Sequence, residues 1–211
     1  MKTRRAPAAK AGPAGKSAPP PARPSFDWAR LAKRLPLAFL PALAVWLLFS
    51  PFYNRLLTAG TESFLRLFES PDRSTFYLRD NGWMMVTRSD HGGGQGSLHE
   101  IRLADVHFNF LLWTAFAFAT PGLALAERLR RWGKGLLVLG AFHLVLTALS
   151  AEFVYATQLG DWSLAHYGPW ARNVIGLTKH VTDLPLKLAM PLILWVAFFG
   201  LSGIQKAGPR H

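Results

Sequence analysis

The stretch GLLVLGAFHLVLTALSA, residues 135–151, carries no charged side chain. Three other stretches are likewise uncharged, and they lie between Arg34 and Arg55, between Asp105 and Glu127, and between Lys187 and Lys206. Each is about the length that a helix needs to cross a bilayer core, roughly 17–25 residues. The sequence therefore predicts a mainly α, integral membrane protein with four transmembrane helices, at 26–53, 106–126, 135–157 and 184–204.

Positive charge is concentrated in alternate connections between these helices. The net charge is +12, and the first 34 residues hold nine Lys or Arg against one acid. The segment 127–134 is also basic, whereas the segment from Phe52 to Asp105 holds six basic and seven acidic residues. Because basic loops stay on the cytoplasmic side, both termini and 127–134 are expected inside, with 54–105 and 158–183 outside. We expect a multi-pass protein of the bacterial inner membrane.

The two terminal segments are expected to be cytoplasmic tails. Residues 1–25 are rich in Ala, Pro, Lys and Arg, a composition typical of disorder. Their basic side chains suit anionic membrane lipids and lack the interleaved aromatics of a nucleic-acid site, so we expect no nucleic-acid partner. The basic region is too long for a secretory signal, which indicates a retained anchor. The C-terminal tail is 205–211.

The first outer segment, 54–105, changes from helical to strand-like periodicity. The helix of the first span, which we expect to kink at Pro41, continues beyond the membrane and ends before Pro71. Thr75–Arg79 and Trp83–Arg88 then flank Asp80-Asn81-Gly82, residues that favour a tight hairpin turn. Leu98–Leu103 is a third strand. We therefore expect a small strand-containing extracytoplasmic domain.

The second outer segment, 158–183, has the pattern of an interfacial helix. Trp170, Val174, Leu177 and Val181 recur at intervals of three or four residues, opposite Arg172 and Lys179. A helix with one apolar and one basic face typically lies in the membrane interface, where Trp170 fits the aromatic belt.

Polar residues inside the predicted spans are the first candidates for function, because charge in lipid is costly. His143 lies mid-span, and Glu152, nine residues later, falls on the opposite face of the same helix, so the two form no proton relay. We favour a structural role for His143, hydrogen-bonded to a neighbouring helix, and a packing role for Asn109.

Catalytic, cofactor and metal sites are not expected. The chain has no cysteine, which removes thiolate ligands and a cysteine nucleophile. His91, His99 and His107 are evenly spaced but lack the short ligand spacings of a zinc site. The glycine-rich stretch 92–96 lacks the Gly-Lys-Ser/Thr ending of a phosphate loop, so a flexible connection is favoured.

One segment supports a family resemblance. The sequence HFNFLLWTAFAFATPGLALAERLRR, residues 107–131, combines a polar start, a long aliphatic run, Ala119-Thr120-Pro121 and a basic exit. With the hydropathy of the whole chain, it resembles the small membrane proteins associated with exosortase H in bacterial envelope-sorting systems. The resemblance implies an inner-membrane accessory of a sorting enzyme and no catalytic residues. Exosortases resemble thiol peptidases, and a chain without cysteine cannot use that mechanism.

The sequence thus predicts a non-catalytic accessory protein that binds membrane lipids and an exosortase or another membrane protein through its outer loop. The candidate contact residues are Trp83, Arg88, Asn109 and Trp170. Two alternatives stay open. One is an enzyme acting at the outer face on a lipid-linked or peptide substrate, with His99, His107 or Glu152. The other is a transporter or channel subunit lined by His143, Thr147 and Glu152.

Overall fold

The computed structural model describes residues 27–69, 73–79, 82–91 and 99–200. The predicted tails 1–25 and 205–211 therefore lie outside the described residues, as does the glycine-rich stretch 92–96. The described elements are α1 (Trp28–Leu65), β1 (Ser74–Arg79), β2 (Trp83–Arg88), β3 (His99–Arg102), α2 (Leu103–His107), α3 (Asn109–Ala119), α4 (Leu125–Thr157), α5 (Asp161–His166), α6 (Pro169–Val181), the π-helical η3 (Thr182–Leu186), α7 (Lys187–Trp195) and the π-helical η4 (Val196–Gly200).

Three helices are long and apolar enough to cross a membrane: Trp28–Leu65, Leu125–Thr157 and Pro169–Gly200. The protein is therefore mainly helical and suited to a membrane, as predicted. The predicted span 106–126 corresponds to a shorter apolar helix, Leu103–Ala119. Its predicted end is wrong, because the helix stops at Ala119 and Gly122 adopts a φ of +78° just after Pro121. Proline and a left-handed glycine both end a helix.

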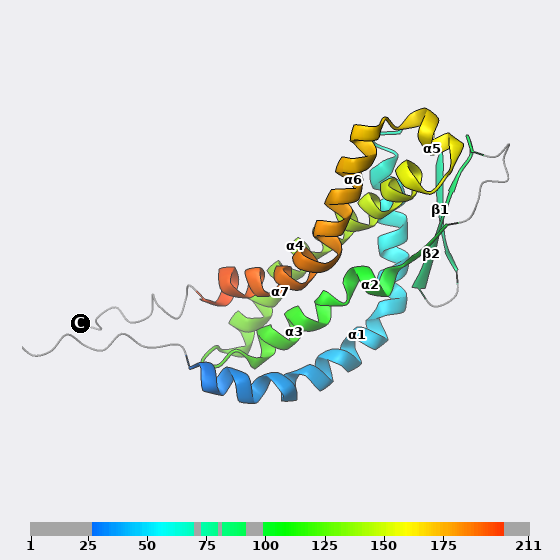
Figure 1. The fold of residues 1–211 in the computed structure, drawn as a ribbon. Helices are drawn as coiled ribbons and strands as arrows, with labels where there is room; N and C mark the ends of the chain where they lie inside the picture. The colour runs from blue at the N-terminus through cyan, green and yellow to red at the C-terminus, as the bar shows by residue number, and fades with distance from the viewer. Residues whose placement is uncertain (1–26, 70–72, 80–81, 92–98, 201–211) are drawn as a thin grey trace, which may run out of the picture.

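Helix α1 is continuous from the first predicted span into the outer segment. It contains Pro36, Pro41 and Pro51, and Figure 1 shows a pronounced bend between its blue and cyan halves. A proline inside a helix removes one backbone hydrogen bond and crowds the preceding turn, so these residues account for the bend. Its N-terminus is capped by Asp27, whose carboxylate accepts a hydrogen bond from the backbone N–H of Arg30.

The segment 127–134, expected as a connecting loop, instead forms the first turns of α4. Strong helix formers fill this segment, and Arg131 Nε donates to Glu127 Oε1 at 2.6 Å across one helical turn. The sequence analysis also expected an interfacial helix within 158–183 that is separate from a membrane helix at 184–204, and the structure differs here. The chain stays helical from Pro169 to Gly200 and changes direction through η3, which contains Pro185.

The three predicted strands are confirmed, with slightly different ends, and form one antiparallel sheet in the order β1-β2-β3. Phe76 pairs with Val86, and Met84 pairs with Ile101. Gly82 has a φ of +106°, which a glycine adopts without strain as the chain enters β2. One sheet face joins an apolar core, made with residues of α1, α2 and α4: Leu57, Leu65, Phe76, Met84, Val86, Leu103, Val106, Leu146, Val154 and Tyr155.

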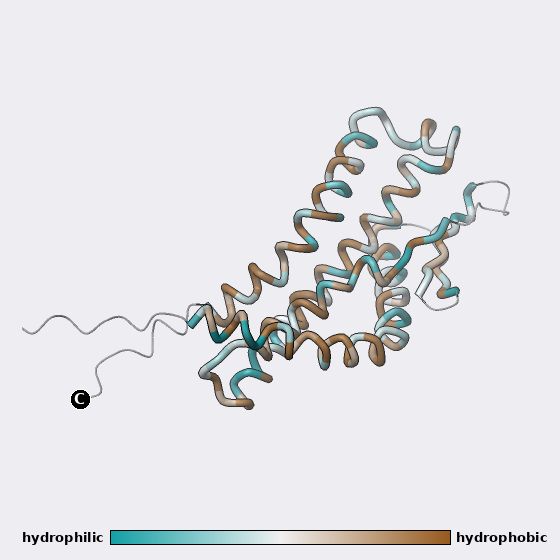
Figure 2. Tube along the Cα trace, turned by 60° about the horizontal axis from the view of Figure 1, so that its bottom comes forward, coloured by the Kyte–Doolittle hydropathy of each residue, from teal (hydrophilic) through white to brown (hydrophobic). Residues whose placement is uncertain are grey.

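A second core lies among α1, α3, α4, α7 and η4. It is built around Trp113, Leu139, Trp195 and Phe199, all buried. Figure 1 shows the start of α1, the α3–α4 connection and the end of η4 at one end of the molecule, with the sheet and α5 at the other. Figure 2 shows hydrophobic residues dominating the helices between these ends. The two cores therefore support opposite ends of one bundle.

Candidate functional site

Six polar residues of the helical bundle form one hydrogen-bonded group, which we call the histidine seam: Trp46, Tyr53, Asn54, His107, Asn109 and His143. His143 of α4 lies fully buried at its centre. Its Nδ1 is 2.7 Å from the Tyr53 hydroxyl of α1, and its Nε2 is 2.6 Å from Asn109 Oδ1 of α3. The predicted bond between His143 and a neighbouring helix is confirmed, and so is the role of Asn109 in joining helices.

The orientation of Asn109 fixes the proton on His143. Asn109 Nδ2 donates to the backbone oxygen of Lys187 at 3.4 Å, which leaves Oδ1 facing the imidazole. An amide oxygen only accepts, so His143 Nε2 carries a hydrogen and donates it to Asn109, while Nδ1 shares a hydrogen bond with the Tyr53 hydroxyl. One histidine thus joins α1, α3 and, through Asn109, the start of α7.

His107 forms the second branch of the seam. The indole Nε1 of Trp46 can only donate, and it lies 3.1 Å from His107 Nδ1. Nε2 therefore carries the proton of the neutral ring and donates to Asn54 Oδ1 at 2.7 Å. The two imidazole centroids are 6.4 Å apart, and the Tyr53 ring contacts both edge-on. Both ring nitrogens of each histidine are engaged in internal hydrogen bonds.

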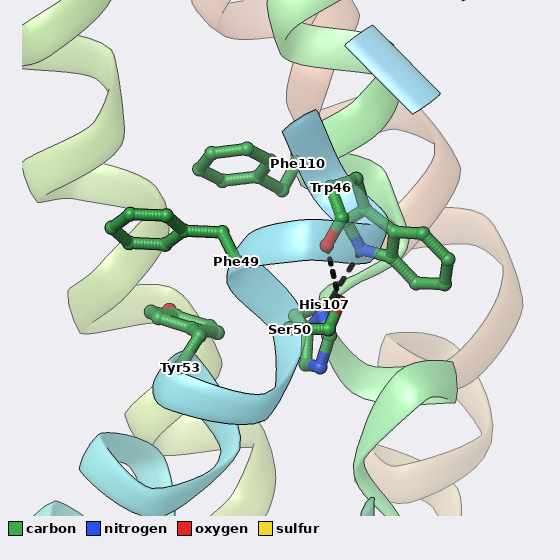
Figure 3. Close-up of a pocket in the computed structure, with 6 residues that line it drawn as sticks. All are labelled: Trp46, Phe49, Ser50, Tyr53, His107 and Phe110. Carbon is green, nitrogen blue, oxygen red and sulfur yellow. Dashed lines mark hydrogen bonds between the residues drawn. The ribbon is translucent and has the colours of Figure 1, made fainter. Parts of the chain in front are cut away.

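A small hollow opens beside the seam, as Figure 3 shows. It encloses about 190 Å³, including the open space at its mouth. Its lining is almost entirely aromatic: Trp46, Phe49, Ser50, Tyr53, His107 and Phe110. The Ser50 hydroxyl donates to the Trp46 carbonyl oxygen at 2.6 Å. The hollow is therefore apolar in character and offers no pair of groups placed for acid–base chemistry.

At the sheet end, buried Arg88 of β2 connects the segment after α1, the turn after β2, α4 and α5. Its guanidinium donates to Glu69 Oε1 at 3.0 Å and to both carboxylate oxygens of Asp90, at 2.9 and 3.1 Å. It also stacks on the rings of Tyr155 and Trp162, 4.6 Å from each centroid. We call Glu69, Arg88, Asp90, Tyr155 and Trp162 the Arg88 cluster. Because Arg88 is enclosed, its contacts are with the protein's own residues.

Electrostatics reinforce this cluster. The hydrogen bond and positive charge of Arg88 lower the pKa of the Asp90 carboxyl, against a smaller opposing effect of burial. Burial lowers the pKa of Arg88, but the hydrogen bond to Asp90 and the charges of Asp90, Glu69 and Tyr155 together outweigh it and leave the pKa raised. Each partner therefore favours the charged form of the other. Glu69 also accepts from the Ser74 hydroxyl at 2.7 Å, which connects the end of α1 to β1.

The remaining candidate residues lie apart from one another. Glu152 Oε2 accepts from the Tyr167 hydroxyl at 2.9 Å, and burial raises the pKa of Tyr167. Trp83 begins β2 with 40% of its surface exposed, and Trp170 is 80% exposed on α6. Only these two of the four candidate contact residues are accessible, because Arg88 and Asn109 are buried.

The evenly spaced histidines are only partly brought together, because His91 and His99 lie close enough to interact electrostatically. His107 belongs to the seam, whereas His91 lies edge-on to Trp162 with centroids 6.3 Å apart. Burial lowers the pKa of His99 on β3. Within the described residues, no three His, Cys, Asp or Glu side chains are grouped to hold a metal ion.

The sequence analysis did not predict that two arginines in the basic segment after α3 also bind backbone carbonyl groups. Arg128 Nη2 donates to the Thr120 carbonyl oxygen at 2.9 Å, and Arg131 Nη1 donates to the Phe198 carbonyl oxygen at 2.7 Å. These arginines satisfy carbonyls at the ends of α3 and η4, where the helix dipole favours positive charge. The partners Tyr53 and Asn54 were also missed. Nothing in their local pattern points to residues 53 or 90 positions away.

Comparisons with known proteins return nothing. No family model matches the chain, and neither a curated protein nor a solved structure matches it. The resemblance to exosortase-associated proteins therefore stays a prediction.

Proposed function

We propose that the protein is a non-catalytic, multi-pass accessory of the bacterial inner membrane that assists an exosortase-type protein-sorting system through its extracytoplasmic sheet. This function is supported by the contrast between buried polar groups, which bond to one another, and an aromatic side chain that stays exposed. The histidine seam and the Arg88 cluster engage their polar atoms in internal bonds, whereas Trp83 is exposed on the sheet. Tryptophan is enriched among the residues that contribute most of the binding energy at protein interfaces, which makes exposed Trp83 the candidate contact.

The proposed topology has four crossings. The start of α1 and the α3–α4 connection lie at the same end of the molecule, while the sheet lies at the other (Figure 1). A chain that crosses through α1 must therefore return through α2 and α3 before α4 begins. Leu103–Ala119 spans about 25 Å at 1.5 Å per residue, close to the roughly 30 Å of a bilayer core. The basic connection after α3 favours a cytoplasmic location for that end.

The two alternative functions have weaker support. An enzyme would need His99, His107 and Glu152 to converge, but His107 bonds Trp46 and Asn54, and Glu152 bonds Tyr167. A transporter would need His143 and Thr147 to line a watery path. Both are fully buried, and the Thr147 hydroxyl donates to the His143 carbonyl oxygen at 2.7 Å.

Crosslinking in native membranes, followed by purification and identification of the bound proteins, tests the proposal. We expect recovery of a cysteine-containing, multi-pass sorting enzyme. The Trp83→Ser variant should recover much less of it, whereas Leu129→Ser, a similarly exposed apolar residue on the first turns of α4, should recover as much as the wild type. A protein that purifies alone, or equal recovery with both variants, would contradict the proposal.

A further inference from the structure

The last apolar helix, Pro169–Gly200, is bent, and its two arms pack on different helices. α6 lies along α4, whereas α7 lies along α3. Figure 1 shows the angle between α6 and α7. The two arms are held unequally, because α6 has no buried residue and α7 buries Lys187, Pro191, Leu194 and Trp195. α7 is therefore the anchored arm, and α6 is the arm that its surroundings hold less firmly.

The backbone of the bend lacks two regular hydrogen bonds. Pro185 in η3 and Pro191 in α7 have no N–H group to donate to the preceding turn. An N–H at position 191 would bond the Lys187 carbonyl oxygen, four residues earlier, and the Asn109 amide of α3 takes this place at 3.4 Å. The angle at η3 therefore depends on side-chain contacts as well as on the backbone.

One ion pair crosses the bend. Lys187 Nζ bonds Asp183 Oδ1 at 2.8 Å, and Pro185 lies between these two residues in the chain. The Lys187 side chain is only 8% exposed, so water reaches the pair from the Asp183 side alone. Lys179 also bonds Asp183, but this second pair lies entirely on the α6 side of Pro185. Lys187 is thus fixed twice, at its Nζ by Asp183 and at its carbonyl oxygen by Asn109.

We propose that α6 is a movable arm, hinged at η3 and held at its angle to α7 by the Asp183–Lys187 ion pair, which we call the latch. α7 stays in place because its buried residues and the Asn109 bond hold it, so release of the latch moves α6. The latch is effective because a pair shielded from water attracts more strongly than an exposed pair. Movement of α6 uncovers the outer part of α4, where Gly176 faces Phe153. The proposal does not depend on any sorting partner.

Distance measurement by double electron–electron resonance tests the proposal on the full chain, which contains no cysteine. Cysteines that carry nitroxide labels replace Asn173 on α6 and Ile193 on α7, both exposed. Their separation of 20 positions corresponds to about 30 Å in a straight helix, and a bend shortens this distance. A second label pair, at Leu129 and Val145 of α4, reports whether the bundle stays folded. The labelled proteins are reconstituted into vesicles of phosphatidylcholine and phosphatidylglycerol.

We expect Asp183→Asn and Lys187→Met to lengthen the distance between α6 and α7 by several ångström and to broaden its distribution, with the α4 distance unchanged. Lys179→Met is the matched control. It removes a bond to the same carboxylate without crossing Pro185, so it should leave both distances as in the wild type. An unchanged α6–α7 distance in the two latch variants would overturn the proposal. An equal shift in Lys179→Met would do so as well, because any lost charge would then move the arm.

Exchange of the two charges separates the latch from a general loss of stability. Asp183→Lys combined with Lys187→Asp, built on Lys179→Met so that no like charge faces the new lysine, re-forms the ion pair across Pro185. The exchanged protein should regain the wild-type distance between α6 and α7. A distance that stays long while the α4 distance is normal would count against the latch. Should Asp183→Asn fail to reconstitute, Lys187→Met and the exchange test the same bond.

Discussion

His143 and Asn109 are 34 positions apart in the chain, yet the His143 Nε2 and Asn109 Oδ1 atoms lie 2.6 Å apart inside the bundle. Asn109 in turn donates to the backbone of Lys187, so a single amide connects α4, α3 and the start of α7. Both side chains are completely buried, and the loss of either leaves one polar atom of the other, His143 Nε2 or Asn109 Oδ1, without its hydrogen-bond partner.

Replacement of Asn109 by Ala should therefore destabilise the bundle by about 1–2 kcal/mol, the range for interhelical polar contacts in membrane proteins. The unfolding free energy in detergent, measured by titration with a denaturing detergent, checks the expectation. Asn173→Ala is the matched control, since that residue is exposed on α6, and it should leave stability unchanged. An equal effect of both substitutions would mean that the seam contributes nothing.

Gly135 allows the close approach of Trp113 to α4. A Cβ atom at position 135 would lie 2.0 Å from Trp113 Cζ2, so the indole would have to move within a packed core. Gly135→Ala should cost about 1–3 kcal/mol, the usual range for overpacking. Gly133→Ala meets no atom within 4 Å and should be neutral or stabilising, because alanine is the better helix former. Thermal unfolding of the two variants in the same detergent compares them directly.

Arg88 should be the most sensitive charged residue at the sheet end of the molecule. Arg88→Ala leaves the largely enclosed Glu69 carboxylate without its cationic partner and removes two ring contacts, so we expect a loss of about 3–5 kcal/mol. Arg79→Ala removes an exposed pair with Glu100 and should cost less than about 1 kcal/mol. Hydrogen exchange of the sheet amides reports the difference. Comparable protection in both variants would argue against the cluster as a support of the sheet.

The Arg88–Asp90 pair predicts a dependence of stability on acid. The pKa of Asp90 is lowered in the folded protein, so the unfolded chain takes up a proton first as the pH falls. The stabilisation is complete above the unfolded pKa of about 3.9 and is lost as the pH falls below it. The melting temperature between pH 6 and pH 3 should fall less steeply for Asp90→Asn than for the wild type. Parallel curves would contradict the linkage.

The sequence by itself determined much of the local structure. Uncharged stretches predicted the long apolar helices, and the strand-like residues on both sides of Asp80-Asn81-Gly82 predicted the sheet. Both predictions succeed because hydrophobic periodicity and turn chemistry depend on a few neighbouring residues. The end of the helix after Ala119 is also encoded locally, in Thr120-Pro121-Gly122, so the predicted end at residue 126 lies beyond the residues that interrupt the helix. The helical start of α4 differs from the prediction as well, because the charged residues of 127–134 were expected to form a connecting loop.

Only the tertiary structure decided which polar residues meet. His143, Asn109 and Arg88 were each selected from sequence, but their partners Tyr53, Lys187 and Glu69 come from distant parts of the chain. A hydrogen bond depends on positions set to within a few tenths of an ångström by the packing of several helices, and that packing is a property of the whole chain. Burial likewise separated Arg88 and Asn109, which support the fold, from Trp83 and Trp170, which remain accessible.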